Sequence, residues 1–394
     1  MGRYVGLVFA VGLACGYLGS VAWHGMSANT GGRNFDDAEW SLKALWVPRP
    51  HFSNKVKAEG EFRYEITVPS LYRWYAGAVI RVAGVQDQCI DAVSPREWFP
   101  PEVPETPPAM LSRREYGFVQ PVVLDTLRSA NVFLYTVMLC FLFVIAYGIT
   151  GKSVAAVFTL APIAISPTFW DCVAWRMGPD ALLCLMFVVT LAAWLWLGGW
   201  KRLVLVSVLC GLTCATKQNG VLVLAAWCGY LVFSSKGARR VLWPLIAVVV
   251  AGIVFCAVNP ATWHGPWRFL VGSVWMRRVL ANGMAMGHEQ RTSWQFLNDA
   301  LPLWPVVPVY LGLLWGRRRE EWLQPIAWWS IFLVFGTLLT IPATETRYLA
   351  PLELGLYFAT AVCVVSLLGG GEWKRFLDSY RDWRRRDYGH RGSF

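Results

Sequence analysis

Three basic residues lie at the borders of long apolar runs, where a charge is energetically costly. Arg176, Lys217 and Arg347 each stand within a few residues of such a border. A cation at the edge of membrane hydrocarbon costs on the order of 1–3 kcal/mol unless it reaches water or a counter-charge. Three such cations gathered on one face would suit an anion at membrane depth, and the phosphate of a lipid has that chemistry.

A second interpretation treats each of these cations as an ordinary interface anchor. Arg176 would then pair with the nearby Asp180. In the same way, Arg347 would pair with Glu345. The anion site is favoured because the topology described below brings all three cations to one side of the membrane.

Two adjacent carboxylates, Asp36 and Asp37, follow the first apolar run. Neighbouring carboxylates repel each other, so one pKa rises unless a cation intervenes. The pair suits a general base, or together with Glu39 a site for a divalent cation such as magnesium or manganese. The alternative is structural, because Asn34 or Asp36 could cap a helix through Leu45 with acids in its first turn.

The composition indicates a membrane protein rather than a soluble enzyme. The 394 residues are 56% hydrophobic and only 15% charged, whereas a soluble domain carries about a quarter charged residues. The 23 Trp residues suit a protein with two membrane interfaces. The net charge is +11, but no basic segment interleaved with aromatics suggests a nucleic-acid groove. We therefore predict an all-α, polytopic transmembrane helical bundle without a nucleic-acid partner.

Apolar runs of membrane-crossing length define about ten spans at roughly 20 residues each. The first follows Arg3 and is interpreted as a retained signal anchor. The predicted spans cover 4–23, 130–149, 154–169, 180–197, 203–216, 220–233, 241–258, 301–315, 326–340 and 349–368.

The distribution of basic residues sets the predicted orientation. With the N-terminus inside, every short connection on the inner side is basic, which satisfies the positive-inside rule. Both termini are then cytoplasmic, and the tail 369–394 is a basic cytoplasmic segment. The basic residues of the inner connections are Lys152, Lys201, Arg202, Lys236, Arg239, Arg240, Arg317, Arg318 and Arg319.

Two longer segments fall outside in this topology, the first outer loop 24–128 and the second outer loop 259–300. Within the first, residues 68–85 predict an amphipathic helix lying on the membrane surface. Eight of the ten Cys residues fall in apolar runs, where Cys acts as a small hydrophobe. Cys89 and Cys172 fall in outer loops, and whether they pair stays open. The whole chain, 1–394, is predicted to form one transmembrane domain.

Four segments occur in a fixed order on the predicted outer side. This ordered set resembles that of the GT-C glycosyltransferases that use a polyprenyl-phosphate-linked sugar, such as the dolichyl-phosphate-mannose protein mannosyltransferases and the lipid A aminoarabinose transferase. The resemblance covers nearly the whole chain. The segments are Asp36-Asp37, Arg176-Met177-Gly178-Pro179-Asp180, Thr216-Lys217-Gln218-Asn219-Gly220 and Arg347-Tyr348-Leu349-Ala350-Pro351.

The resemblance implies an inverting transfer of a sugar from the lipid phosphate to an acceptor hydroxyl. Asp36 would be the general base, and Asp37 would orient the acceptor or hold Asp36 ionised. Lys217 and Arg347, with Arg176 as a third cation, would stabilise the departing phosphate. Further residues expected to contact substrate are Asp180, Asn219, Tyr348, Glu345 and His264.

Two departures limit what the resemblance transfers. The second acid is Asp37 where the family usually has Glu, and the chain shows neither a soluble C-terminal domain nor a high span count. The acceptor therefore stays open among protein, lipid and glycan, and so does metal dependence. Two other classes are carried as alternatives: a non-catalytic subunit with a GT-C fold, and a lipid or sugar transporter. The short inner loops favour a prokaryotic plasma (inner) membrane.

Overall fold

The structure of the chain is a computed structural model. It describes residues 71–85, 121–164, 166, 168–169, 173, 178–259, 262, 322–340 and 349–368.

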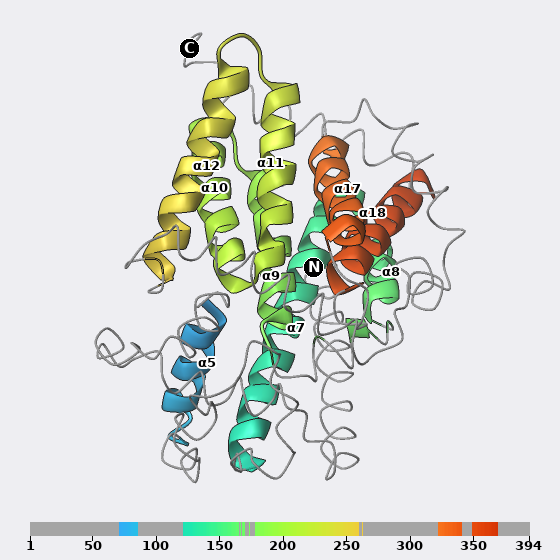
Figure 1. Ribbon diagram of the computed structural model, residues 1–394. Helices are drawn as coiled ribbons and strands as arrows, with labels where there is room; N and C mark the ends of the chain where they lie inside the picture. Colours follow the sequence, from blue (N-terminus) through green and yellow to red (C-terminus); the bar gives the residue numbers. More distant parts are fainter. Residues whose placement is uncertain are drawn as a thin grey trace, which may run out of the picture.

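The described residues are helical, and no strand occurs among them, which confirms the all-α prediction for this part of the chain. Figure 1 shows the helices gathered side by side. In chain order they are α5 (Leu71–Val82), α7 (Pro121–Thr150), α8 (Ser153–Ala164), α9 (Asp180–Trp196), α10 (Gly199–Thr216), the 3-10 helix η3 (Gln218–Gly220), α11 (Val221–Ser234), α12 (Arg239–Val258), α17 (Leu323–Thr340) and α18 (Ala350–Leu368).

Among the described residues, three helices are long and apolar enough to cross a membrane by length and composition: Asp125–Thr150 within α7, α10 and α12. Five further apolar helices in the described residues are shorter. Eight of the predicted spans coincide with helices. The predicted spans 4–23 and 301–315 lie outside the described residues, so the count of ten stays a prediction.

Two helices differ from their predicted bounds for identifiable reasons. α7 begins at Pro121, nine residues before the predicted start. Proline suits the first position of a helix, and the polar residues that follow it hid this extension from a search for apolar runs. α8 ends at Ala164 rather than at 169. Pro167 follows closely, and a proline disfavours helical backbone in the residue before it.

Close helix contacts depend on small residues and buried tryptophans. α10 packs against α9 and α12, while α11 lies between α12 and α17. A Cβ added at Gly211 of α10 would overlap the backbone of Ala251 in α12, so this contact needs glycine. Trp194 and Trp227 meet edge to face with ring centroids 5.0 Å apart. Trp227 also donates a hydrogen bond to the Ser207 hydroxyl at 3.2 Å.

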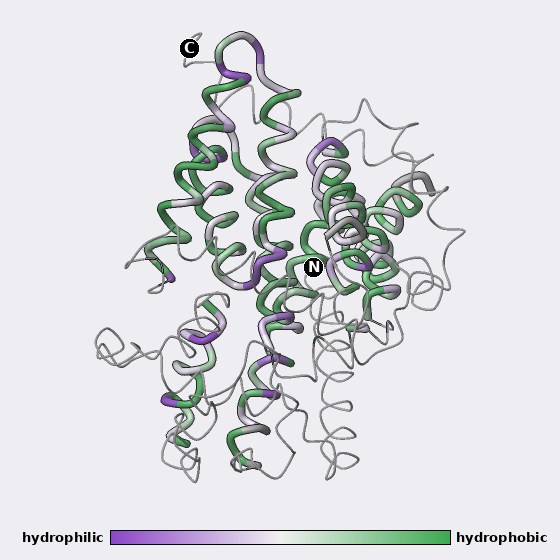
Figure 2. Tube along the Cα trace, in the orientation of Figure 1, coloured by the Kyte–Doolittle hydropathy of each residue, from purple (hydrophilic) through white to green (hydrophobic). Residues whose placement is uncertain are grey.

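Successive helices from α9 to α12 are antiparallel, so their polar ends fall into two groups (Figure 1). One group, here called the motif end, contains Asp180 and Lys217. The other, here called the basic end, consists of the starts of α10 and α12 and the connection before α12, with Lys201, Arg202, Lys236, Arg239 and Arg240. Figure 2 shows mainly hydrophobic residues along α10, α11 and α12 between the two ends.

The helix predicted at 68–85 is present as α5, Leu71–Val82, and lies at the motif end; its place on the membrane surface stays a prediction. Trp74 donates its indole hydrogen to the carbonyl of Val258, the last residue of α12, at 3.2 Å. Tyr75 donates its hydroxyl hydrogen to the carbonyl of Ala130 in α7 at 2.8 Å. Burial holds the pKa of Tyr75 well above its usual range, so its hydroxyl keeps this proton. α5 is thus fixed across the end of the helix assembly by two side chains.

Candidate functional site

Lys217 sits in a tight turn between α10 and α11. The residue takes an extended backbone conformation, with φ −156° and ψ 151°, directly after α10 ends. The next three residues form η3, and the amide of Gly220 donates to the Lys217 carbonyl at 2.8 Å. A Cβ at Gly220 would overlap the Thr213 backbone. Glycine at this position is therefore what lets the chain fold back so closely behind the lysine.

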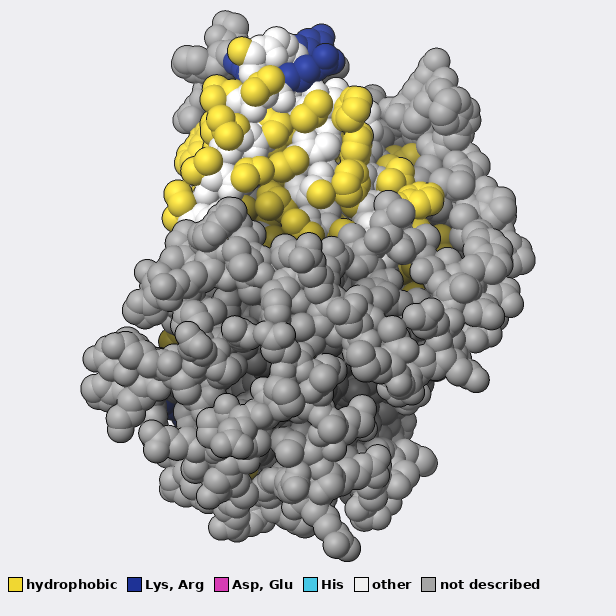
Figure 3. Space-filling view, in the orientation of Figure 1, with side chains coloured by type: hydrophobic (Ala, Val, Ile, Leu, Met, Phe, Trp, Pro, Cys, Tyr) yellow, Lys and Arg dark blue, Asp and Glu magenta, His cyan; other side chains and the backbone are white. Residues whose placement is uncertain are grey.

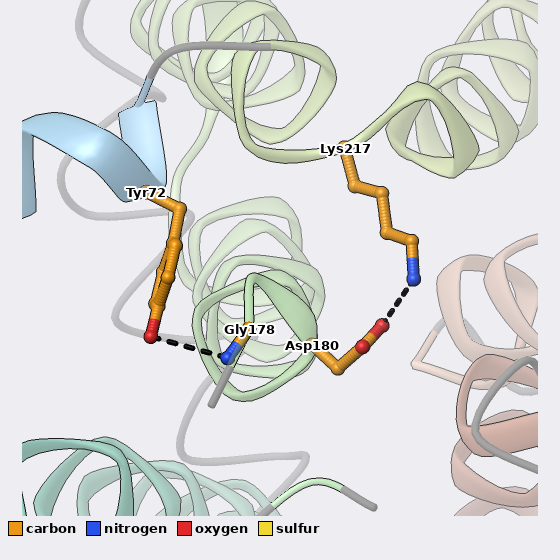
Figure 4. A network of polar contacts seen from close by, with 4 residues as sticks. All are labelled: Tyr72, Gly178, Asp180 and Lys217. Atoms are coloured by element: carbon orange, nitrogen blue, oxygen red, sulfur yellow. Dashed lines mark hydrogen bonds and ion pairs between the residues drawn. The ribbon is translucent and has the colours of Figure 1, made fainter. Parts of the chain in front are cut away.

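Asp180 meets Lys217 across the motif end. Pro179 precedes the helix, and Asp180 opens α9, where a negative charge is stabilised by the helix dipole. The Lys217 Nζ atom lies 2.5 Å from Asp180 Oδ1, and the two side chains are 18% and 6% exposed. Figure 4 shows the lysine side chain reaching toward the carboxylate. Asp180 thus has Lys217 as a partner, and Arg176, its partner in the interface-anchor interpretation, lies outside the described residues.

Tyr72 fixes the turn that leads into α9. Its hydroxyl accepts a hydrogen bond from the amide of Gly178 at 3.2 Å and donates to Asn131 Oδ1 at 3.3 Å. Both Tyr72 and Asn131 are buried. Figure 4 shows the tyrosine approaching Gly178, two residues before Asp180. The surface helix, α7 and the start of α9 are thereby joined through one hydroxyl group.

Glu353 is a buried carboxylate that the sequence analysis did not single out. It lies in the first turn of α18 and is 1% exposed. The hydroxyl of Ser166 donates to Glu353 Oε2 at 2.5 Å, and that of Thr168 donates to Oε1 at 2.6 Å. Both hydroxyls come from the connection between α8 and α9. The signal was a charged residue inside the predicted span 349–368, and such residues are usually functional in membrane proteins.

Cys184 lies near both Asp180 and Glu353. It lies one turn after Asp180 on α9 and is fully buried. It is within electrostatic range of Asp180, Lys217 and Glu353. The Lys217–Asp180 pair and Glu353 are therefore both within electrostatic range of this buried position. Asp180 is itself the negatively charged group that the start of α9 and the Lys217 ammonium stabilise.

Most of the predicted site residues lie outside the described residues. These are Asp36, Asp37, Arg176, His264, Glu345, Arg347 and Tyr348. The cysteines Cys89 and Cys172 also lie outside them. Asn219 is described, half-buried in η3 two residues after Lys217. The structure therefore brings together Lys217 and Asp180, with Asn219 beside them in the chain.

The described residues contain no group of three or more His, Cys, Asp and Glu side chains that could hold a metal ion. The predicted metal ligands Asp36, Asp37 and Glu39 lie outside them. Comparison with protein-family models and with curated proteins gives no match.

Proposed function

We propose that the chain is an integral membrane glycosyltransferase of the GT-C type. It moves a sugar from a polyprenyl-phosphate donor to a hydroxyl group of a lipid, glycan or protein acceptor. The supporting observation is the ion pair of Lys217 and Asp180 at the motif end. A cation held in place among apolar helices is suited to a phosphate that carries a long hydrocarbon chain.

The proposed orientation follows from charge. The basic end carries five cations and would face the cytoplasm under the positive-inside rule. The motif end would then face the periplasmic or extracytoplasmic side, with ten spans and both termini inside. The donor lipid fits this arrangement because its isoprenoid chain stays in hydrocarbon while its phosphate reaches the level of Lys217.

In the proposed reaction, Asp36 removes the proton from the acceptor hydroxyl as that oxygen attacks the anomeric carbon. The bond between the anomeric carbon and the phosphate oxygen breaks, and polyprenyl phosphate leaves from the opposite face. The anomeric configuration inverts. Lys217 and Arg347, with Arg176, stabilise the charge that grows on the phosphate. Asp37 orients the acceptor.

Asp180 has a positioning role in this proposal, because its carboxylate fixes the direction of the Lys217 ammonium. Asn219, Tyr348, Glu345 and His264 are proposed to contact the sugar or the acceptor. Asp36, Asp37 and Glu39 supply hard oxygen ligands of the kind that magnesium or manganese prefers. Adding a chelator to the assay below tests whether the reaction needs such an ion.

The test is release of free polyprenyl phosphate from a panel of polyprenyl-phosphate sugars by the purified full-length chain. Candidate acceptors of the three classes are added in turn. Asp36→Asn and Lys217→Ala are compared with wild type. Asp378→Asn and Lys236→Ala are matched controls, because they remove the same charges on the predicted cytoplasmic side.

Loss of release in both site variants, with both controls active and all proteins folded, would support a lipid-linked donor and the proposed residues. Release that neither site variant lowers would mean that these residues are the wrong ones. If no donor turns over with any acceptor class, the transferase proposal fails in favour of a transporter or a non-catalytic subunit.

A further inference from the structure

The basic end carries a dense group of cations that the proposed reaction does not use. Lys201, Lys236, Arg239 and Arg240 are exposed, and Arg202 is half-buried. Figure 3 shows Lys and Arg side chains gathered where α11 connects to α12, next to a hydrophobic surface.

Backbone and ring contacts hold several of these cations in place. Arg202 donates from Nε to the carbonyl of Leu197 at 2.6 Å and from Nη1 to the hydroxyl of Tyr230 at 3.4 Å. Because Tyr230 belongs to α11, this contact brings the start of α10 beside the end of α11. Arg239 lies over the ring of Trp243, 5.6 Å from its centroid. The cluster is thus partly organised before any ligand arrives.

The nearby chain supplies no negative charge to this cluster. Residues 181–288 contain no Asp or Glu. Within the described part of the chain, no carboxylate lies at ion-pair distance from any of the five cations. The described residues therefore leave these cations without a carboxylate partner, which favours an anionic ligand.

An apolar stripe runs from this cluster along α12. Val241, Leu245, Val249 and Ile253 recur every fourth residue, so they share one face of the helix, and they are 74%, 57%, 50% and 64% exposed. The stripe is about 18 Å long at 1.5 Å per residue. That is close to one leaflet of a hydrocarbon core about 30 Å thick. Trp200 is exposed at the start of α10, next to Lys201 in the chain, as is common for interfacial tryptophans.

We propose that the basic end and the α12 stripe form a binding site for an anionic phospholipid. The phosphate and charged headgroup bind Lys236, Arg239 and Arg240, and one acyl chain lies along the stripe. This inference is independent of the proposed transferase reaction and requires only that the protein reside in a membrane.

The test is native mass spectrometry of the full-length chain, titrated with phosphatidylglycerol or with phosphatidylcholine of the same acyl chains. The variant K236Q/R239Q/R240Q removes three cations from the proposed site. The control R317Q/R318Q/R319Q removes three from another predicted inner connection. At about a fivefold gain per basic residue beside an anionic headgroup, the site variant loses about a hundredfold in phosphatidylglycerol affinity. The control keeps its affinity.

Equal affinity of the wild type for the two lipids would overturn the proposal, as would equal losses in the site variant and the control. Displacement of the lipid by millimolar inorganic phosphate would show a site for free phosphate and would also overturn it. If the triple variant does not fold, R239Q/R240Q is compared with R239K/R240K. Only the charge-removing pair should then lose phosphatidylglycerol.

Discussion

The partly buried pair of Lys217 and Asp180 predicts a strongly non-additive response to substitution. At 2.5 Å and an effective dielectric constant of about 20, the Coulomb attraction is about 7 kcal/mol. Desolvation of both charges offsets much of it. Removing one partner of a fully buried pair costs about 3–5 kcal/mol, and a partly buried pair belongs at the lower end of that range. We expect Lys217→Met and Asp180→Asn each to lower the free energy of unfolding by about 3 kcal/mol. The double variant should lose about as much as either single one.

The assay is thermal unfolding in detergent, followed with a dye that becomes fluorescent on reaction with exposed thiols. Cys184, Cys210 and Cys363 are buried, so reaction of these thiols reports loss of structure, and Cys184 lies one turn from Asp180. At about 2 °C per kcal/mol for a large domain, each single variant should lower the unfolding midpoint by about 6 °C. All variants are scanned at one rate, because membrane proteins often unfold irreversibly.

Lys236→Met is the matched control, since it removes an exposed lysine at the basic end. Its midpoint should change by about 1 °C or less, as for an ordinary surface substitution. The reasoning is refuted if the loss in the double variant equals the sum of the two single losses within about 0.5 kcal/mol. The two side chains would then not be coupled, and Asp180 would not position Lys217.

The same measurement tests three other contacts. Tyr72→Phe removes the hydroxyl that joins α5 to the start of α9, and should cost about 1–2 kcal/mol; an unchanged midpoint would mean that the contact is unimportant. Gly220→Ala should cost more than about 2 kcal/mol because its Cβ overlaps backbone, whereas Gly252→Ala, which faces open space, should be neutral or stabilising. Glu353→Ala should lower the free energy of unfolding by about 3 kcal/mol, because it leaves a cavity and two buried hydroxyls without an acceptor. A smaller loss than that of Ser166→Ala would contradict this prediction.

Local features of the candidate site could be predicted from sequence because short-range chemistry decides them. Asp180 was predicted to open a span because the apolar run 180–197 starts there, and α9 begins at this residue. The turn at 216–220 was predicted from two apolar runs separated by polar residues and Gly220. This turn can be tight because Gly220 has no side chain, and a Cβ there would overlap the Thr213 backbone.

Contacts between distant segments could not be predicted in this way. Lys217 pairs with a residue 37 positions earlier, and periodicity says nothing about which cation meets which acid. The interpretation that paired Asp180 with Arg176 relied on nearness in sequence alone. Glu353 was overlooked for a related reason. One acid in a run of apolar residues barely changes the mean hydropathy, although its burial makes it costly.

The charges of the described site limit what it can bind by itself. If Asp180 and Glu353 are both ionised, the group that includes Lys217 has a net charge of −1. If Glu353 is protonated, the net charge is zero. In neither state does this group attract a phosphate through net charge. An anion site at the motif end therefore needs at least one further cation, and helix N-termini alone supply only partial charges.

Arg347 is one cation that the chain offers close in sequence to the start of α18. It precedes Leu349 by two residues, and α18 with its buried Glu353 begins at Ala350. Two residues span less than about 8 Å of chain, so we expect the guanidinium to be within reach of the start of α18. If the phosphate needs both cations, Arg347→Gln should abolish polyprenyl phosphate release even though Lys217 and its partner stay in place. Arg347→Lys should retain part of it, because a point charge replaces the forked guanidinium. Full release by Arg347→Gln would show that the reaction does not depend on a second cation there, and the phosphate would have to be placed elsewhere.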